Sequence, residues 1–151
     1  MKFLTFSLVF LTFRRQIGLI QYSILQYNLS RMGKKTLVIG ASENPSRYSY
    51  LAIGRLLANQ HEVVAIGAKK GEALGVQIDK ELMPYDDIDT ITLYVNPMRQ
   101  KEYYEYILRL EPKRVIFNPG TENPELYNLL HQNNIEVDVA CTLVLLSMDQ
   151  Y

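Results

Sequence analysis

The sequence predicts an α/β fold in which a five-stranded parallel sheet lies between two layers of helices. Short runs of β-branched and apolar residues alternate along the chain with segments of helical periodicity. A turn of small residues, Gly40-Ala41-Ser42, joins the first such run to the first helix, and Asn-Pro pairs at 96–97 and 123–124 start later helices. With 151 residues and 48% hydrophobic composition, the chain has enough apolar material for one domain with a buried core.

The five predicted strands are short and largely apolar, which is typical of strands covered by helices on both faces of a parallel sheet. Their predicted bounds are Thr36–Ile39, Glu62–Ile66, Thr90–Val95, Arg114–Phe117 and Ile135–Val139. Between the second and third strands, Gly67–Asp79 predicts a loop because it contains three glycines and two lysines, and Glu81–Ile88 predicts a short helical connection.

Three predicted helices carry apolar residues on one side at the spacing of an amphipathic helix. They span 46–60, 98–110 and 124–132, and Thr142–Met148 predicts a terminal helical turn. The residues expected to face inward are Ala52, Ile53, Leu56 and Leu57 in the first helix, Tyr104, Ile107 and Leu108 in the second, and Leu126, Leu129 and Leu130 in the third.

Strict alternation of strands and helices, with right-handed crossovers, favours a Rossmann-like sheet of strand order 3-2-1-4-5. The switch point is expected between the first strand and the strand that begins at Thr90, and ligands bind at such a point, outside the carboxyl ends of the strands. The unusual residue clusters all follow strand ends: Gly40-Ala41-Ser42, Gly67-Ala68-Lys69-Lys70, Asn96-Pro97, Asn118-Pro119-Gly120 and Cys141-Thr142.

The first strand, its small-residue turn and the helix that follows predict a site for a phosphorylated cofactor. Backbone N–H groups at a helix N-terminus favour an anion, small residues at 40–42 allow close approach, and Arg47 adds a charged donor. The Gly-x-Gly-x-x-Gly fingerprint is absent, and the second strand ends without an acidic residue for ribose hydroxyls. Lys69 and Lys70 stand there instead, which suits the additional phosphate of NADP or coenzyme A, although two lysines are equally common in a solvated loop.

The sequence offers no catalytic or metal-binding constellation. His61 and His131 are expected at the opposite edge of the sheet, and Cys141 is interpreted as a buried structural cysteine rather than a reactive thiol. A net charge of zero does not indicate nucleic-acid binding, and a single cysteine fits a reducing compartment, hence the cytoplasm.

The first 31 residues differ in composition from the rest of the chain. They contain four basic and no acidic residues, whereas the remainder holds 12 basic and 16 acidic residues and a net charge of −4. The segment is interpreted as a signal-peptide-like core, as a basic membrane-surface segment, or as the product of a start site placed too far upstream. We favour the last: residues 1–31 lie outside the fold, Met32 is the true start, and 32–151 form the domain, with no membrane association.

Taken in order, these motifs resemble the CoA-binding domain family, the small Rossmann-like family related to the N-terminal domain of the succinyl-CoA synthetase α subunit. The resemblance covers 33 to about 148, essentially the whole domain. The matching segments are Gly40-Ala41-Ser42, Asn44-Pro45, Arg47-Tyr48-Ser49, Glu72-Ala73-Leu74-Gly75, Tyr94-Val95-Asn96-Pro97, Asn118-Pro119-Gly120-Thr121-Glu122 and the strand that leads to Cys141.

The resemblance implies a cofactor site at these positions. Gly40-Ala41-Ser42 and Arg47, with Asn44 and Tyr48 beside them, would hold the phosphates of coenzyme A or an acyl-CoA. The other implied contacts are Lys69 or Lys70 for the CoA phosphate region, Asn96 and Pro97 beside the nucleotide or pantetheine, and Asn118 and Gly120 on the far side.

The chain also departs from the family pattern. The residues before Lys69 are Gly67-Ala68 where relatives often have Asn-Pro, and Thr142 follows Cys141 where relatives commonly have proline. The second domain of the synthetase, which carries its phosphorylated histidine, is absent, so ligase activity is not expected to transfer.

Three functions therefore stand as hypotheses. The first is a stand-alone CoA or acyl-CoA binding protein without chemistry of its own, and the second is an NADP-dependent enzyme or redox sensor on the same fold. The third is a regulatory partner protein that has lost the ligand, with a homodimer contact through the clustered Tyr103, Tyr104 and Tyr106.

Overall fold

A computed structural model describes residues 17–25 and 33–151, and the chain divides into two units at Met32/Gly33. In the first unit, residues 17–25 form a helix with exposed side chains. Among the residues the structure describes, no helix has the length and apolar character needed to cross a membrane. Met32 and most of the N-terminal segment lie outside the described residues, so the proposed start at Met32 stays a prediction.

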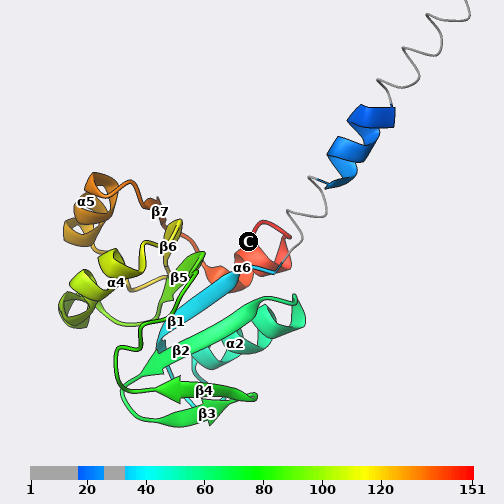
Figure 1. Cartoon of the computed structure of the whole chain (residues 1–151). Coiled ribbons are helices and arrows are strands. Elements are labelled where there is room, and N and C mark those ends of the chain that lie inside the picture. The colour runs from blue at the N-terminus through cyan, green and yellow to red at the C-terminus, as the bar shows by residue number, and fades with distance from the viewer. Residues whose placement is uncertain (1–16, 26–32) are drawn as a thin grey trace, which may run out of the picture. The chain divides into compact units, whose positions relative to one another are not determined.

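The second unit is built on one seven-stranded sheet (Figure 1). Its order is β3-β4-β2-β1-β5-β6-β7, and all neighbouring pairs are parallel except the β3–β4 hairpin. The strands are β1 (Lys35–Ala41), β2 (Glu62–Gly67), β3 (Gly71–Ala73), β4 (Val76–Asp79), β5 (Thr90–Leu93), β6 (Arg114–Phe117) and β7 (Glu136–Asp138).

The predicted five strands in the order 3-2-1-4-5 are wrong, because the segment predicted as the loop Gly67–Asp79 adds two strands. Leu74 and Gly75, with φ of 54° and 84°, form a two-residue turn between β3 and β4. β4, and not the predicted third strand, pairs with β2. The predicted third strand is β5, which pairs with β1 on the side away from β2. The predicted position of the switch point, between β1 and β5, is confirmed.

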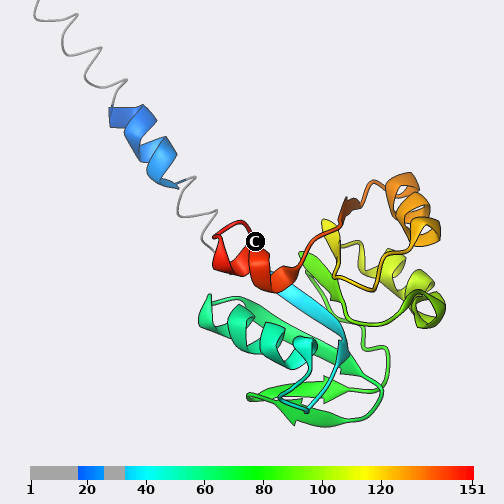
Figure 2. The ribbon, with the colours of Figure 1, turned by 180° about the vertical axis from the view of Figure 1, so that it is seen from behind.

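The helices cover both faces of the sheet (Figures 1 and 2). On one face, α2 and α6 pack on Val38 of β1 through Ile53, Leu56 and Leu146. On the other, α4 and α5 pack on Leu37 and Ile39. Their bounds are α2 (Tyr48–Ala58), α3 (Pro97–Gln100), η1 (Lys101–Tyr103), α4 (Tyr104–Leu110), α5 (Pro124–Gln132) and α6 (Thr142–Ser147).

The two Asn-Pro helix starts are confirmed by their capping bonds. The Asn96 side-chain oxygen accepts a hydrogen bond from the Arg99 N–H at 3.1 Å, and that of Asn123 accepts one from the Leu126 N–H at 3.3 Å. In each case the proline after the asparagine occupies the first helical turn.

Other local predictions need correction. The helix predicted over 98–110 is interrupted by the 3₁₀ turn η1, and the described residues of Glu81–Ile88 contain no helix. Leu57 was expected to face inward but is 37% exposed. Tyr103 and Tyr106 belong to the hydrophobic core, with Tyr104 packed against it, so this cluster does not offer the predicted dimer surface.

The amino-terminal edge of the sheet is closed by the last residue of the chain. Tyr151 bonds to Thr36 through its hydroxyl, at 2.8 Å, and its ring lies 4.7 Å from both the Arg114 guanidinium and the His61 ring. The Lys34 backbone N–H donates to His61 Nδ1 at 2.9 Å, so the neutral ring carries its proton on Nε2. His61 therefore lies at the edge the sequence predicted for it.

Gly40 allows the end of β1 to turn tightly beside β5. Its φ is +93°, and a Cβ there would lie 2.7 Å from the Tyr94 carbonyl oxygen. The Tyr94 N–H donates to the Ile39 carbonyl at 2.8 Å, which holds the two segments together. Only glycine fits both the conformation and the spacing.

We expect Gly40→Ala to lower the free energy of unfolding by about 2–4 kcal/mol, since it adds a backbone collision to an unfavourable φ. Gly75→Ala is the matched control, because Gly75 has a similar φ of +84° with nothing within 4 Å of the added carbon. It should cost about 1–2 kcal/mol. Chemical denaturation of both variants tests this, and equal losses would contradict the collision.

The free energy of unfolding should also decrease as the pH falls below about 6.5, because of His61. Burial, together with the nearby charges of Lys34 and Arg114, lowers the pKa of His61. The unfolded chain then binds more protons than the folded one between the lowered pKa and about 6.5, so the free energy of unfolding decreases across that window as pH falls.

His61→Asn should flatten this dependence, since the amide oxygen can accept the Lys34 N–H bond without titrating. His131→Gln, at an exposed position of α5, is the control for removing a histidine from the chain. Denaturation midpoints between pH 5 and 8 measure it, and an unchanged slope in His61→Asn would refute the assignment.

Candidate functional site

A cavity of about 510 Å³ lies at the carboxyl ends of the central strands. Its walls come from the turn after β1, the first turn of α2, and the segments after β5 and β6. The lining residues are Gly40, Ala41, Ser42, Arg47, Tyr48, Ser49, Ala68, Tyr94, Val95, Asn96, Arg99, Tyr103, Pro119, Gly120 and Thr121.

A second hollow of about 590 Å³ shares Ala41, Ser42, Arg47 and Ala68 with the first. It adds Glu43 and Asn44 from the loop after β1, Lys69 from the segment after β2, and Ile78 of β4. The two hollows therefore form one groove, which we call the carboxyl-edge groove. It crosses the switch point between β1 and β5, where an open α/β sheet binds its ligands.

The loop between β1 and α2 is fixed by its own side chains. The Ser42 hydroxyl accepts the Asn44 N–H at 3.2 Å, and the Asn44 side-chain oxygen accepts both the N–H and the hydroxyl of Ser46, at 3.0 and 2.7 Å. These bonds are typical of an Asx turn. They hold the backbone of the loop in one conformation up to Arg47, the residue that precedes α2.

The N-terminus of α2 faces the groove. Among the described residues, no side chain caps it, and its first turn carries no acidic residue. The helix dipole and the N–H groups of its first turn are thus directed at the space lined by Tyr48 and Ser49. An anion in that space would be favoured by both.

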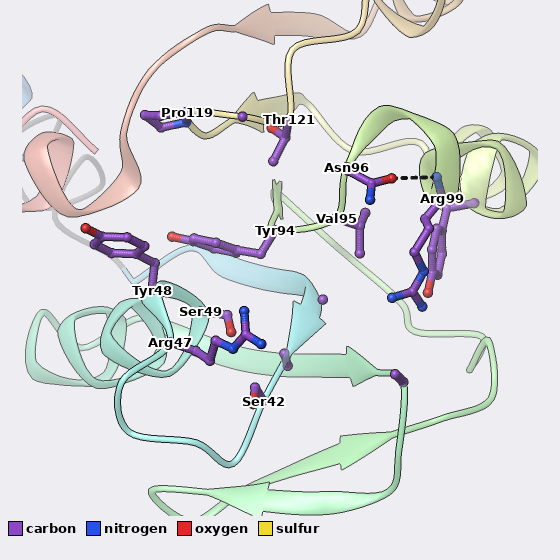
Figure 3. Close-up of a pocket in the computed structure, with 15 residues that line it drawn as sticks. Ser42, Arg47, Tyr48, Ser49, Tyr94, Val95, Asn96, Arg99, Pro119 and Thr121 are labelled. Atoms are coloured by element: carbon purple, nitrogen blue, oxygen red, sulfur yellow. Dashed lines mark hydrogen bonds between the residues drawn. The ribbon is translucent and has the colours of Figure 1, made fainter.

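Two arginines line the groove from different elements. Figure 3 shows Arg47 reaching in from the start of α2 and Arg99 from the helix after β5, with the groove between them. Lys69 lines the adjoining hollow. The groove therefore has cationic groups at several points along its length, as an extended polyanion needs.

Tyr94 contributes a buried hydroxyl group that lies near the hydroxyls of Thr92 and Thr142. Within the described part of the chain its hydroxyl is buried and has no hydrogen-bond partner. The neighbouring hydroxyls of Thr92 and Thr142 bond to each other at 2.8 Å. Burial raises the pKa of Tyr94 well above its usual value, so the hydroxyl stays protonated and can donate a hydrogen bond.

Most of the predicted site residues come together in the groove. Those that line it are Gly40, Ala41, Ser42, Asn44, Arg47, Tyr48, Lys69, Asn96 and Gly120. Lys70 instead forms an ion pair with Glu81 at 3.2 Å, and Pro97 begins α3. Neither is among the residues that line the groove.

Asn118 has a structural position rather than the ligand-facing one expected from the sequence. It is 3% exposed, and its amide nitrogen donates to Thr92 Oγ1 at 2.7 Å and to the Leu93 carbonyl at 3.0 Å. Its oxygen accepts the N–H of Thr142 at 2.8 Å. Asn118 thus joins the ends of β5 and β6 to the start of α6.

Several groove residues escaped the sequence prediction. Ser49, Tyr94, Val95, Arg99 and Tyr103 all line it. Arg99 had a usable signal, since it lies three residues after the capping Asn96 and so in the first turn of a helix that starts at the carboxyl edge. Tyr94 lies in a segment that matches the family pattern, whereas Tyr103 had no such signal, because an aromatic residue at its position is more often part of the core.

The remaining reactive side chains lie elsewhere. Cys141 was predicted to be a buried structural cysteine but is half-buried, and it is not among the residues lining the groove. His131 is exposed on α5. Across residues 17–25 and 33–151, no group of three or more His, Cys, Asp or Glu side chains could hold a metal ion.

Comparison with known proteins gives a consistent result. Residues 34–147 match the model of a family described as a CoA binding domain. A crystal structure described as an uncharacterized protein is 51% identical to this chain, with a TM-score of 0.77, over 79% of this chain and 98% of that one. A search of curated proteins found no match.

Two more distant structures share the fold. A hypothetical protein from Pyrococcus horikoshii OT3 is 24% identical, with a TM-score of 0.70, over 78% of this chain and 84% of that one. The dinucleotide-forming acetyl-coenzyme A synthetase 1 from Ca. Korarchaeum cryptofilum, in complex with phosphate and ADP, is 18% identical, with a TM-score of 0.60, over 74% of this chain but only 26% of the synthetase.

The structural position of Asn118 can be tested by Asn118→Ala. The change leaves the Thr142 N–H and the Leu93 carbonyl without their buried partner, so we expect a loss of about 2–4 kcal/mol in unfolding free energy. Asn133→Ala is the control, since Asn133 bonds to the Leu129 carbonyl at an exposed site and should change stability by about 0.5 kcal/mol. Similar losses in chemical denaturation would argue against this position for Asn118.

Proposed function

The chain belongs to the CoA-binding domain family, and from this we propose that it binds coenzyme A or an acyl-CoA in the carboxyl-edge groove, without ligase activity of its own. The observation that carries the proposal is the uncapped N-terminus of α2, which faces the groove beside Arg47 and opposite Arg99. A pyrophosphate is the group such an arrangement suits best.

The groove offers places for the parts of the ligand. We assign the pyrophosphate to Gly40-Ala41-Ser42, the first turn of α2 and Arg47. Lys69 is the better candidate for a further phosphate than Lys70, because Lys69 lines the groove while Lys70 pairs with Glu81. Val95 and Tyr103, which also line the groove, would contact the part of the ligand that is less polar than the phosphates.

The proposal of binding without ligation rests on the resemblance, in which the phosphorylated histidine belongs to a second domain of the synthetase. In the described part of this chain, His61 lies at the opposite edge of the sheet from the groove and His131 is exposed on α5. Neither histidine is among the residues lining the groove. We therefore propose a binding protein, and we place it in the cytoplasm because of its single cysteine.

NADP binding is the alternative that a specific observation favours. Lys69 lies in the groove near the end of β2, where the extra phosphate of NADP would also be held. Against it, the groove supplies no histidine or cysteine for acid–base or redox chemistry among its described lining residues. The alternative of a partner protein that has lost its ligand loses its tyrosine interface, since Tyr103 and Tyr106 are buried.

Thermal unfolding of the full chain should distinguish these functions. CoA or acetyl-CoA at about 100 times its Kd should stabilise the folded state by about 2.7 kcal/mol, which corresponds to a rise in Tm of roughly 5–10 °C. Arg47→Ala should weaken binding by about ten- to a hundredfold, because it removes a charged hydrogen bond to phosphate.

Arg55→Ala is the matched control, because Arg55 lies on the same helix but outside the groove and should leave the CoA-induced shift unchanged. NADP, NAD and ATP are compared at the same concentration. A shift with NADP alone would replace the proposal by the redox alternative. No shift with any ligand would favour the partner-protein alternative.

A further inference from the structure

We infer that Gln100 is a positioning residue for cofactor binding, an inference that rests on the proposed function. Gln100 ends α3, is fully buried and does not line the groove. Its side chain nevertheless joins the two segments that form one wall of the groove, those that follow β5 and β6. Its role is to hold these segments at a set separation before a ligand arrives.

The bonds of the Gln100 amide reach both segments. Its nitrogen donates to the Val95 carbonyl at 2.9 Å and to the Thr121 carbonyl at 2.7 Å. Val95 and Thr121 both line the groove. Because a carbonyl can only accept, the two bonds also fix which end of the amide is nitrogen.

The other end of the amide connects to α5. The Gln100 oxygen accepts a hydrogen bond from the Asn123 side-chain nitrogen at 2.8 Å, and the same nitrogen donates to the Tyr104 hydroxyl at 2.8 Å. Asn123 in turn caps α5 through Leu126. Gln100 therefore lies at the centre of a buried polar network that spans α3, α4, α5 and both groove segments.

The network lies where the sheet no longer pairs the two groove segments. Paired residues of β5 and β6 end at Leu93 and Phe117, so Val95 and Thr121 lie beyond the ladder. Side-chain amides continue the connection there, with Asn118 at the Leu93 carbonyl and Gln100 further out. Without Gln100, the ligand itself would have to order these segments, and that cost would be subtracted from its affinity.

The test compares two ligand probes with two substitutions. Gln100→Met keeps a similar volume but removes both donors, and Gln100→Glu keeps the shape but replaces donors by acceptors. We expect each to weaken CoA binding by about tenfold or more. Inorganic pyrophosphate, which we assign to the turn at 40–42, the first turn of α2 and Arg47, should bind both variants as it binds the unsubstituted chain. Arg47→Ala should weaken the binding of both probes.

Titration calorimetry is performed well below the Tm of each variant, so that loss of stability does not enter the affinity. Leu56→Ala is the control for destabilisation, since Leu56 is buried in the α2 core and does not line the groove. It should lower stability and leave CoA affinity unchanged. Folded Gln100 variants with normal CoA affinity, or with equal losses for CoA and pyrophosphate, would overturn the inference.

A measurement on the unsubstituted chain covers the case in which neither variant folds. The side-chain amide protons of Gln100 should exchange with solvent far more slowly than those of the exposed Gln132 and Gln150, and more slowly still with CoA bound. Exchange as fast as in those glutamines would overturn the inference. If the unsubstituted chain binds no CoA, the proposed function itself fails, a result distinct from normal CoA binding by Gln100 variants.

Discussion

The groove depends on how closely the end of β1 approaches β5. At Gly40 the backbone has a φ of +93° and lies against the Tyr94 carbonyl, while Tyr94 bonds back to Ile39. This contact lets the chain turn tightly at the end of β1. The turn lies at the switch point, where the connections from the two central strands cross to opposite faces of the sheet. Because α2 starts at Tyr48, eight residues after Gly40, its N-terminus is brought to the groove rather than to bulk solvent.

Beyond the ends of the strands, buried amides take over from the backbone ladder. Asn118 and Gln100 each satisfy backbone groups of segments that the sheet no longer pairs, and Asn123 links Gln100 to α5. Buried polar groups are costly when unpaired, so a network with partners at each of these atoms selects one arrangement of the segments. The rigidity of the wall opposite α2 thus comes from side chains, whereas that of the β1 turn comes from backbone sterics.

The sequence predicts the parts of this fold that have a local physical signal. β1, β5 and β6 are runs of β-branched residues, and the Asn-Pro caps depend on neighbouring residues only. The hairpin at β3 and β4 was missed because its strands are short and its turn places Leu74, not the usual Asn or Gly, at a positive φ. The burial of Asn118 was equally hard to predict. Asn118 and Asn96 both follow strands, and only the contacts of Asn118 with β5 and α6 show that its side chain faces inward.

The distribution of charge favours the groove, over the amino-terminal edge of the sheet, as the place for the proposed anionic ligand. From Met32 onward the chain has a net charge of −4, so positive charge is confined to particular parts of its surface. At the amino-terminal edge, Lys34 bonds to the Tyr151 carbonyl, and Arg114 pairs with Asp138 and stacks on the Tyr151 ring. At the carboxyl edge, Arg47 and Arg99 line an open cavity beside a helix N-terminus. Both edges of the sheet carry cationic side chains, but at the amino-terminal edge they contact Tyr151 and Asp138, whereas the carboxyl edge stays accessible to a ligand.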